Sequence, residues 1–113
     1  MKIFIGADHN GFEFKKQISD FLKRSGHEVV DEGDTALDPA DDFPQFAGRV
    51  VNNLQADKHE AIGILMCGSG QGMCMAANRF KGIRSSLCWN LEEARASRND
   101  DDSNVLCLSA RSM

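Results

Sequence analysis

The chain has 113 residues with 17 acidic and 13 basic side chains, giving a formal net charge of −4 at neutral pH. This length is typical of one domain with a single core, and an acidic balance without a basic stripe argues against a nucleic-acid partner. The apolar run at the N-terminus is too short for a signal peptide or a membrane span, so we expect a cytoplasmic protein without a membrane partner.

The cysteines and histidines do not form a metal-binding pattern. No CxxC pair is present, and no histidine stands near a cysteine at the spacing of metal ligands. Isolated cysteines with mostly apolar neighbours are typical of reduced thiols inside a cytosolic protein. We therefore expect no metal ion. The residues concerned are Cys67, Cys74, Cys88, Cys107, His9, His27 and His59.

The first half of the chain alternates β-rich runs with amphipathic segments. Residues 2–7 (KIFIGA) predict a strand, and apolar residues at helical spacing over 14–22 predict the helix that follows. Residues 27–31 (HEVVD) predict a second strand. The acid-rich residues 32–42 predict a loop, and residues 44–54 predict a second amphipathic helix.

The second half continues this alternation. Its predicted elements are a strand over 61–66, a glycine-rich loop over 67–72, a helix over 73–80, a strand over 83–88, a helix from Asn90 and a strand over 105–109. Strands that alternate with helices indicate a parallel sheet covered on both faces. We therefore predict an α/β fold, a three-layer α/β/α sandwich with five parallel strands of the Rossmann-like or flavodoxin-like kind, forming one domain over residues 1–113.

The glycine-rich loop is the strongest functional signal in the sequence. Gly68, Gly70 and Gly72 leave successive backbone N–H groups unobstructed, which suits a phosphate, a carboxylate or an enediolate. Cys67 stands between the strand and this loop, where N–H groups and a helix N-terminus favour a thiolate, so it is a candidate base or nucleophile. A buried structural cysteine would fit the position equally well. The loop lacks the lysine of a P-loop.

Other polar residues follow the predicted strands. Because the carboxyl ends of parallel strands meet at one edge, Asp8, His9 and Arg111 should lie near the loop. Asp8 could instead only cap the first helix, and Arg111 could be a surface cation. Convergence of a guanidinium with the loop would indicate an anionic substrate. Whether residues 100–102, all aspartates, reach this edge depends on how the chain enters the last strand; a solvated turn is the other interpretation.

Four stretches together resemble one known family. GADHNGFEFK (6–15), DFPQFA (42–47), CGSGQGMCMAANRFKGIR (67–84) and SRNDDDSNVLCLSAR (97–111) are similar in order and spacing to the B-type ribose-5-phosphate isomerases, a family that includes galactose-6-phosphate and allose-6-phosphate isomerases. The resemblance implies an aldose–ketose isomerase that acts on a sugar phosphate of the ribose 5-phosphate type through a cis-enediolate, without metal or organic cofactor.

The resemblance also implies roles for individual residues. The cysteine that matches Cys67 moves the proton between two carbons, and the hydroxyl residue that matches Ser69 assists it. The loop amides hold the enediolate oxygens. Asp8 would hydrogen-bond the substrate hydroxyls, while His9 and Arg111 would belong to the phosphate side.

Three departures from the family pattern leave alternatives open, one of them Phe43 where the family usually has a tyrosine. Asp100 stands where the family has the histidine that opens the furanose ring, and an ordinary aspartate is ionised near neutral pH and only accepts protons. Asp100 occupies the catalytic position of that histidine but should be a poor ring-opening acid, so an open-chain tetrose phosphate is an alternative substrate. The family's C-terminal helical arm does not follow here. A truncated or non-catalytic paralogue that binds a sugar phosphate is the other alternative.

The same departure bears on assembly. Without the arm, a lone chain would expose apolar sheet surface, and large exposed apolar patches are uncommon on monomers. The family's sites are shared between subunits. We therefore expect a homodimer whose ligand is a small sugar phosphate.

Overall fold

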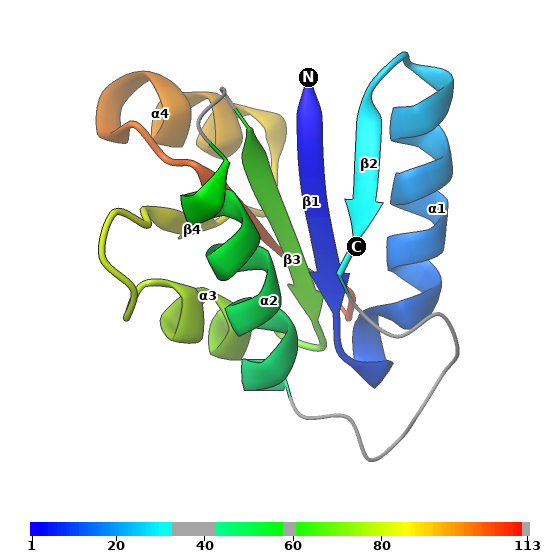
Figure 1. Ribbon diagram of the computed structural model, residues 1–113, viewed down its shortest axis with the longest axis horizontal. Coiled ribbons are helices and arrows are strands. Elements are labelled where there is room, and N and C mark those ends of the chain that lie inside the picture. The colour runs from blue at the N-terminus through cyan, green and yellow to red at the C-terminus, as the bar shows by residue number, and fades with distance from the viewer. Residues whose placement is uncertain (33–42, 58–60, 112–113) are drawn as a thin grey trace.

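The computed structural model describes residues 1–32, 43–57 and 61–111. In chain order the elements are β1 (Lys2–Ala7), the 3-10 turn η1 (His9–Gly11), α1 (Phe12–Arg24), β2 (Glu28–Asp31), α2 (Phe43–Ala56), β3 (Ile62–Cys67), α3 (Gln71–Ala77), β4 (Ser85–Leu87), α4 (Leu91–Asp101) and β5 (Val105–Ser109) (Figure 1). The loop predicted over 32–42 lies outside the described residues, apart from Glu32.

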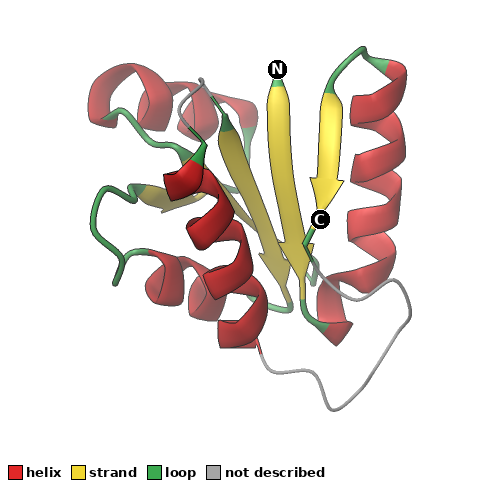
Figure 2. Cartoon of the chain, in the orientation of Figure 1, coloured by secondary structure: helices red, strands yellow, loops and turns green. Residues whose placement is uncertain are grey.

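The five strands form one parallel sheet with helices on both faces, as predicted. Its order is β2-β1-β3-β5-β4, and every pair of neighbours is parallel. Helix α1 covers one face, and α2 and α3 cover the other (Figure 2). Helix α4 lies over the α1 face at the other end of the sheet, where it lines a hollow together with Ile62 and Leu106.

The strand order differs from the flavodoxin order 2-1-3-4-5 in one respect: β5 lies between β3 and β4, and β4 is the edge strand. The sequences of the two strands give the physical reason. Strand β5 (VLCLS) is apolar and almost wholly buried, whereas β4 (SSL) has three residues that are all half-buried. A continuous apolar run suits a central position in a parallel sheet, and a short, partly polar strand suits an edge.

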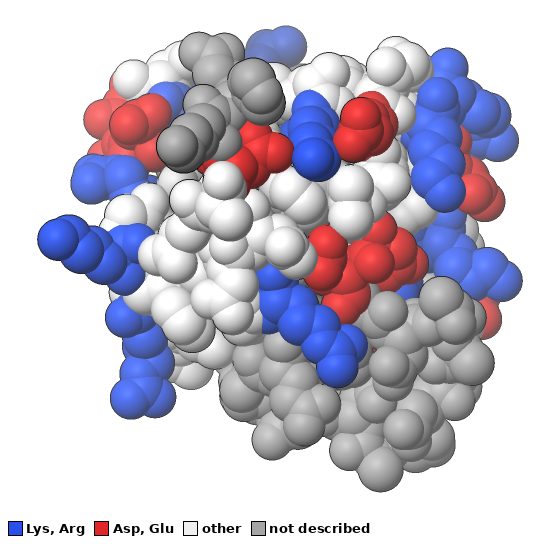
Figure 3. Space-filling model, viewed as in Figure 1, with Lys and Arg blue, Asp and Glu red and all other residues white. Residues whose placement is uncertain are grey.

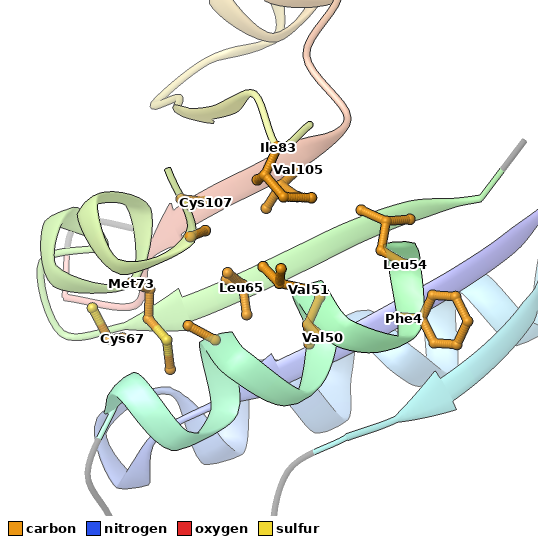
Figure 4. Packing of buried hydrophobic residues seen from close by; sticks show 12 residues of the cluster. Phe4, Val50, Val51, Leu54, Leu65, Cys67, Met73, Ile83, Val105 and Cys107 are labelled. Atoms are coloured by element: carbon orange, nitrogen blue, oxygen red, sulfur yellow. The ribbon is translucent and has the colours of Figure 1, made fainter. Parts of the chain in front are cut away.

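Two apolar clusters hold the layers together, one on each face. The cluster under α2 and α3 includes Leu65, Met73 and Cys107, and Figure 4 shows these side chains between the sheet and the two helices. The cluster under α1 includes Ile5 and Met66. Fully burying one such side chain stabilises the fold by roughly 2 kcal/mol relative to leaving it exposed.

Gly63 is required for the close contact between β3 and α2. A Cβ atom at this position would lie 2.9 Å from Cγ1 of Val50, which is completely buried. The one interruption of the apolar run in β3 is therefore a packing feature. It lets α2 lie close against the centre of the sheet.

The predicted elements are confirmed, with several boundaries displaced by one to three residues. Helix α3 begins two residues earlier than predicted, because Gly70 adopts φ of 78° and its carbonyl already accepts the Cys74 N–H. Strand β4 begins at Ser85 instead of residue 83. There the Asn78 side chain accepts the Ser85 N–H at 2.8 Å and donates to the Ser85 carbonyl at 3.0 Å. The predicted start of α4 is confirmed, since Asn90 accepts the Glu93 N–H.

On the face shown in Figure 3, lysines and arginines among the described residues lie at both sides and near the centre, and acidic side chains lie among them. No helix among the described residues is long and apolar enough to cross a bilayer.

Candidate active site

The carboxyl ends of the three central strands meet at one hollow. Asp8 follows β1, Cys67 ends β3, and Arg111 lies just beyond β5, whose last residue pairs with Cys67 in register. The hollow has a volume of about 180 Å³. It is lined by Asp8, Asn10, Cys67, Gly68, Ser69, Gly72 and Arg111. The structure thus brings together most of the site residues that the sequence predicts.

Cys67 is fixed by the loop that follows it. Its side chain is 5 % exposed, and its sulfur accepts a hydrogen bond from the Gly70 N–H at 3.1 Å. Gly70 can do this because glycine tolerates its φ of 78°. A Cβ there would also lie 2.5 Å from Cδ1 of Leu87 and 3.0 Å from the Leu108 backbone. The sulfur therefore has one defined position at the base of the hollow.

The loop is tied to the end of β5 by three hydrogen bonds. The Ser109 hydroxyl donates to the Gly68 carbonyl at 2.8 Å, and the Arg111 N–H donates to the same carbonyl at 3.0 Å. The Ala110 N–H donates to the Cys67 carbonyl at 2.9 Å. With its carbonyls held against β5, the loop keeps a fixed peptide orientation. Its N–H groups can then serve as a preorganised oxyanion site.

Arg111 lies directly against the loop. A Cβ on Gly68 would be 2.8 Å from the Arg111 Nη2 atom, so only a glycine leaves space for the guanidinium here. Two of the three predicted loop glycines thus have separate steric reasons. Gly70 permits the turn, and Gly68 accommodates the cation.

Asp8 performs the capping role that the sequence left open. Its Oδ1 atom accepts the N–H groups of Asn10 at 2.9 Å and Gly11 at 3.3 Å, which orients η1. Both bonds use Oδ1, so the other carboxylate oxygen can bind a ligand while Asp8 caps η1. Asn10 is a lining residue that the sequence interpretation missed, although its place in the DHNG turn was a usable signal.

His9 is half-buried beside the hollow without lining it. Its Nδ1 atom is buried and has no hydrogen-bond partner among the described residues. Ser69 is exposed, and its hydroxyl oxygen accepts the Gln71 N–H at 3.2 Å. This bond uses an oxygen lone pair and leaves the hydroxyl proton free to be donated.

Asp100 is not at this edge in its own chain. It lies near the end of α4, which runs back along the sheet, and the chain then enters β5 at its amino end. The Arg84 Nε atom donates to the Asp101 carbonyl at 2.6 Å there. Val105 and Ser109 are roughly 13 Å apart along β5 at the usual strand rise. The structure therefore does not join Asp100 to Cys67 within one chain.

The comparisons with known proteins agree with this arrangement. A family model described as Ribose/Galactose Isomerase matches residues 3–113. The probable ribose-5-phosphate isomerase B of Mycoplasma pneumoniae is 44% identical over 109 residues, which are 96% of this chain and 71% of that protein. The ribose-5-phosphate isomerase B of Mycobacterium leprae is 37% identical over 111 residues, which are 98% of this chain and 68% of that protein.

Solved structures give the same result. The ribose-5-phosphate isomerase B of Clostridium thermocellum superposes with a TM-score of 0.94 at 41% identity, covering 100% of this chain and 75% of that one. The Mycoplasma genitalium enzyme with bound ribulose-5-phosphate has a TM-score of 0.92 at 44% identity, covering 97% of this chain and 72% of that one. The resemblance read from the sequence is confirmed: the chain belongs to the ribose/galactose isomerase family, a family of sugar isomerases.

Proposed function

We propose that this chain interconverts ribose 5-phosphate and ribulose 5-phosphate through a cis-enediolate, with Cys67 as the base. The observation that carries the proposal is the convergence of one anchored thiol, a row of loop amides and a guanidinium in a single hollow. The relative with bound ribulose-5-phosphate supports the choice of substrate.

The proposed chemistry assigns a task to each group. The Cys67 thiolate takes the proton from C2 of the open-chain aldose and returns it to C1. The N–H groups of the loop stabilise the negative charge that develops on the two oxygens. Ser69 hands a proton between those oxygens through its free hydroxyl hydrogen. Every proton that leaves the substrate in this scheme returns to it, so no external oxidant or reductant takes part.

The remaining residues would bind the substrate. Arg111 is assigned to the phosphate because a guanidinium binds phosphate with two parallel hydrogen bonds, and His9 is assigned to it because the family resemblance implies this role. Asp8 would accept hydrogen bonds from substrate hydroxyls through its second oxygen. All described strands share one sheet, and we assign them to a single isomerase domain in the cytoplasm, where its free cysteines stay reduced.

The proton-transfer role of Cys67 is tested by Cys67→Ser. A serine hydroxyl is not ionised near neutral pH, so we expect kcat to fall by roughly 10²- to 10⁴-fold, the usual contribution of a positioned base. Cys88→Ser is the matched control, because Cys88 is equally buried but does not line the hollow. Coupled spectrophotometric assays and thermal melting should be done on all three proteins. Turnover of Cys67→Ser at the parent rate would refute the assignment.

We also propose that the chain is a homodimer. Helix α4 has no buried residue. A hollow of about 140 Å³ lies beneath it, and Ile62 and Leu106 are among the residues that line this hollow. Trp89 and Leu91, which precede and begin α4, are 54% and 64% exposed. A second copy that covered this surface would remove apolar area from water.

Sedimentation equilibrium at micromolar concentration should therefore give twice the chain mass of 12.4 kDa. Leu91→Glu should shift the equilibrium toward the monomer, whereas Phe21→Glu, at an exposed apolar residue of α1, should not. Only the 12.4 kDa species in the parent would contradict the dimer.

A further inference from the structure

A second group of reactive side chains lies between α3, β4 and β5. It consists of Cys74 of α3, Ser85 of β4 and Cys107 of β5. The Ser85 Oγ atom is 3.0 Å from the Cys74 Sγ atom and 3.3 Å from the Cys107 Sγ atom. The Ser85 hydroxyl is also 3.2 Å from the Cys74 carbonyl oxygen, and the Cys74 sulfur is 3.5 Å from the Ser85 carbonyl oxygen. One hydroxyl thus stands between two thiols, and the proposed isomerisation uses none of the three groups.

The surroundings of the two sulfurs differ. Hydrogen bonds from the Cys107 thiol and the Ser85 hydroxyl lower the pKa of Cys74 to about 6, although partial burial opposes them. The Asn78 amide adds a longer contact of 3.8 Å to the same sulfur. The hydrogen bond to Cys74, together with burial, raises the pKa of Cys107. The pKa of Cys74 is thus lowered while that of Cys107 is raised, so Cys74 is the more readily ionised of the two thiols.

This group lies beside a hollow that two neighbours of the Cys74 sulfur line. Cys74 and Ser85 are half-buried, and both Ser85 and Asn78 line a hollow of about 310 Å³. Each of these two lining residues is in direct contact with the Cys74 sulfur. Cys88 is the opposite case, because it is 3 % exposed and burial raises its pKa. Thiolate character and access, which govern cysteine oxidation, thus coincide at Cys74.

We propose that Cys74 and Cys107 form a peroxide-reactive pair, in which Cys74 is oxidised first and Cys107 then closes a disulfide. In the first step the Cys74 sulfur bonds to one oxygen of a hydroperoxide, the O–O bond breaks, and uptake of one proton yields a sulfenic acid and water or an alcohol. In the second step the Cys107 sulfur bonds to Cys74, the S–O bond breaks, and the Cys107 proton leaves with the hydroxide as water. The thiols lose two electrons and the peroxide gains them.

The test uses the reduced full chain and equimolar hydrogen peroxide at pH 7, followed by alkylation, trypsin and mass spectrometry. Cys67 and Cys74 share the tryptic peptide 59–79, so the reaction is run in both the parent and Cys67→Ser. We expect this peptide linked to peptide 99–111, which carries Cys107, with the loss of two hydrogen atoms. The result does not depend on the proposed isomerase activity, because no turnover is measured.

Single substitutions separate the two steps. Cys107→Ser should leave a Cys74 sulfenic acid that dimedone traps, and Cys74→Ser should leave Cys107 unmodified. Cys88→Ser is the matched control and should keep the crosslink. Ser85→Ala should move the pH midpoint of Cys74 alkylation upward by about one unit, since a hydrogen bond to a charged group is lost. A purely structural serine would leave that midpoint unchanged.

Three outcomes would overturn the proposal. One is a Cys74 that remains as fully alkylated as Cys88 after peroxide treatment of the Cys67→Ser chain. Another is oxidation confined to Cys67 in the parent. The third is a crosslink that joins two chains through Cys74 on non-reducing gels.

Discussion

The two edges of the sheet are built differently, although both carry polar residues that the sequence singles out. At the carboxyl edge the loop after β3 is fixed by buried hydrogen bonds from β5, including the bond from Ser109, which is 1 % exposed, to the Gly68 carbonyl. At the amino edge of β5, Asp100 and its two neighbours are exposed. The loop at the carboxyl edge can therefore keep the fixed geometry that catalysis requires. The acids at the second edge are available to another molecule.

Gly70→Ala should cause the largest loss of stability and turnover, because it disturbs the fixed loop at the carboxyl edge. The left-handed φ of 78° costs roughly 1–2 kcal/mol for an alanine, and the close approach of the new Cβ to Leu87 and to the Leu108 backbone adds roughly 1–3 kcal/mol. The loop would have to move, and Cys67 would lose the N–H that holds its sulfur. We expect a loss of roughly 2–5 kcal/mol in urea unfolding, and turnover reduced by about two orders of magnitude.

Gly82→Ala separates the two causes. Gly82 has nearly the same φ of 81°, but a Cβ there meets nothing within 4 Å. This variant should lose only the backbone part, roughly 1–2 kcal/mol, and should keep its turnover. Equal losses of stability and activity in both variants would show that crowding against β5 does not matter.

Gly68→Ala should have a smaller and more selective effect. Its new Cβ would lie 2.8 Å from the Arg111 Nη2 atom, which belongs to a flexible side chain, so the guanidinium can move away at little cost in stability. We expect KM for ribose 5-phosphate to rise about tenfold, as a charge-assisted contact to the phosphate is weakened, with a smaller change in kcat.

Arg111→Ala is the comparison variant for this prediction. It should raise KM at least as much, and the double variant should be no worse than Arg111→Ala alone, because both changes remove the same contact. Additive losses would mean that Gly68 acts independently of Arg111.

The two edges also differ in how far the sequence could predict them. The carboxyl edge follows from local patterns: apolar strands, turn glycines and the rule that parallel strands end together. That reasoning places Asp8, Cys67 and Arg111 at one hollow. It misses Asn10, and it assigns no positioning role to Ser109, because the bond to Gly68 joins residues 41 positions apart in the chain.

The strand order depends on information that local patterns do not hold, because nothing in them places β5 between β3 and β4. The position of Asp100 needs less: it precedes β5, and a parallel strand is entered at its amino end, away from Cys67. The grouping of Cys74, Ser85 and Cys107 also follows from the strand order. Both cysteines are ordinary apolar residues in the sequence, and only the pairing of β4 with β5 places Ser85 between them.

Asp100→His should have the smallest effect, and it tests the amino edge. The resemblance places a ring-opening histidine at this position, and imidazole can both give and take a proton near pH 7. We expect the substitution to raise kcat/KM for ribose 5-phosphate by several-fold to about tenfold, below the usual range for general acid–base catalysis. Erythrose 4-phosphate cannot close a five-membered ring, so kcat/KM for it should not change. Asp101→His, at the neighbouring exposed acid, is the matched control and should raise neither value.

The same variant also tests whether the site is shared between two subunits, as the resemblance implies. Asp100 lies at the opposite edge from Cys67 of its own chain, so the gain from Asp100→His can arise only if the histidine reaches the hollow of a second subunit. The double variant Asp100→His, Leu91→Glu is expected to be monomeric, so the gain on ribose 5-phosphate should disappear in it. Its activity on erythrose 4-phosphate should equal that of Leu91→Glu alone. A gain that persists in the monomer would mean that α4 moves to its own Cys67. A parent that prefers ribose 5-phosphate, together with a histidine variant that gains nothing, would exclude Asp100 as the replacement for the ring-opening acid.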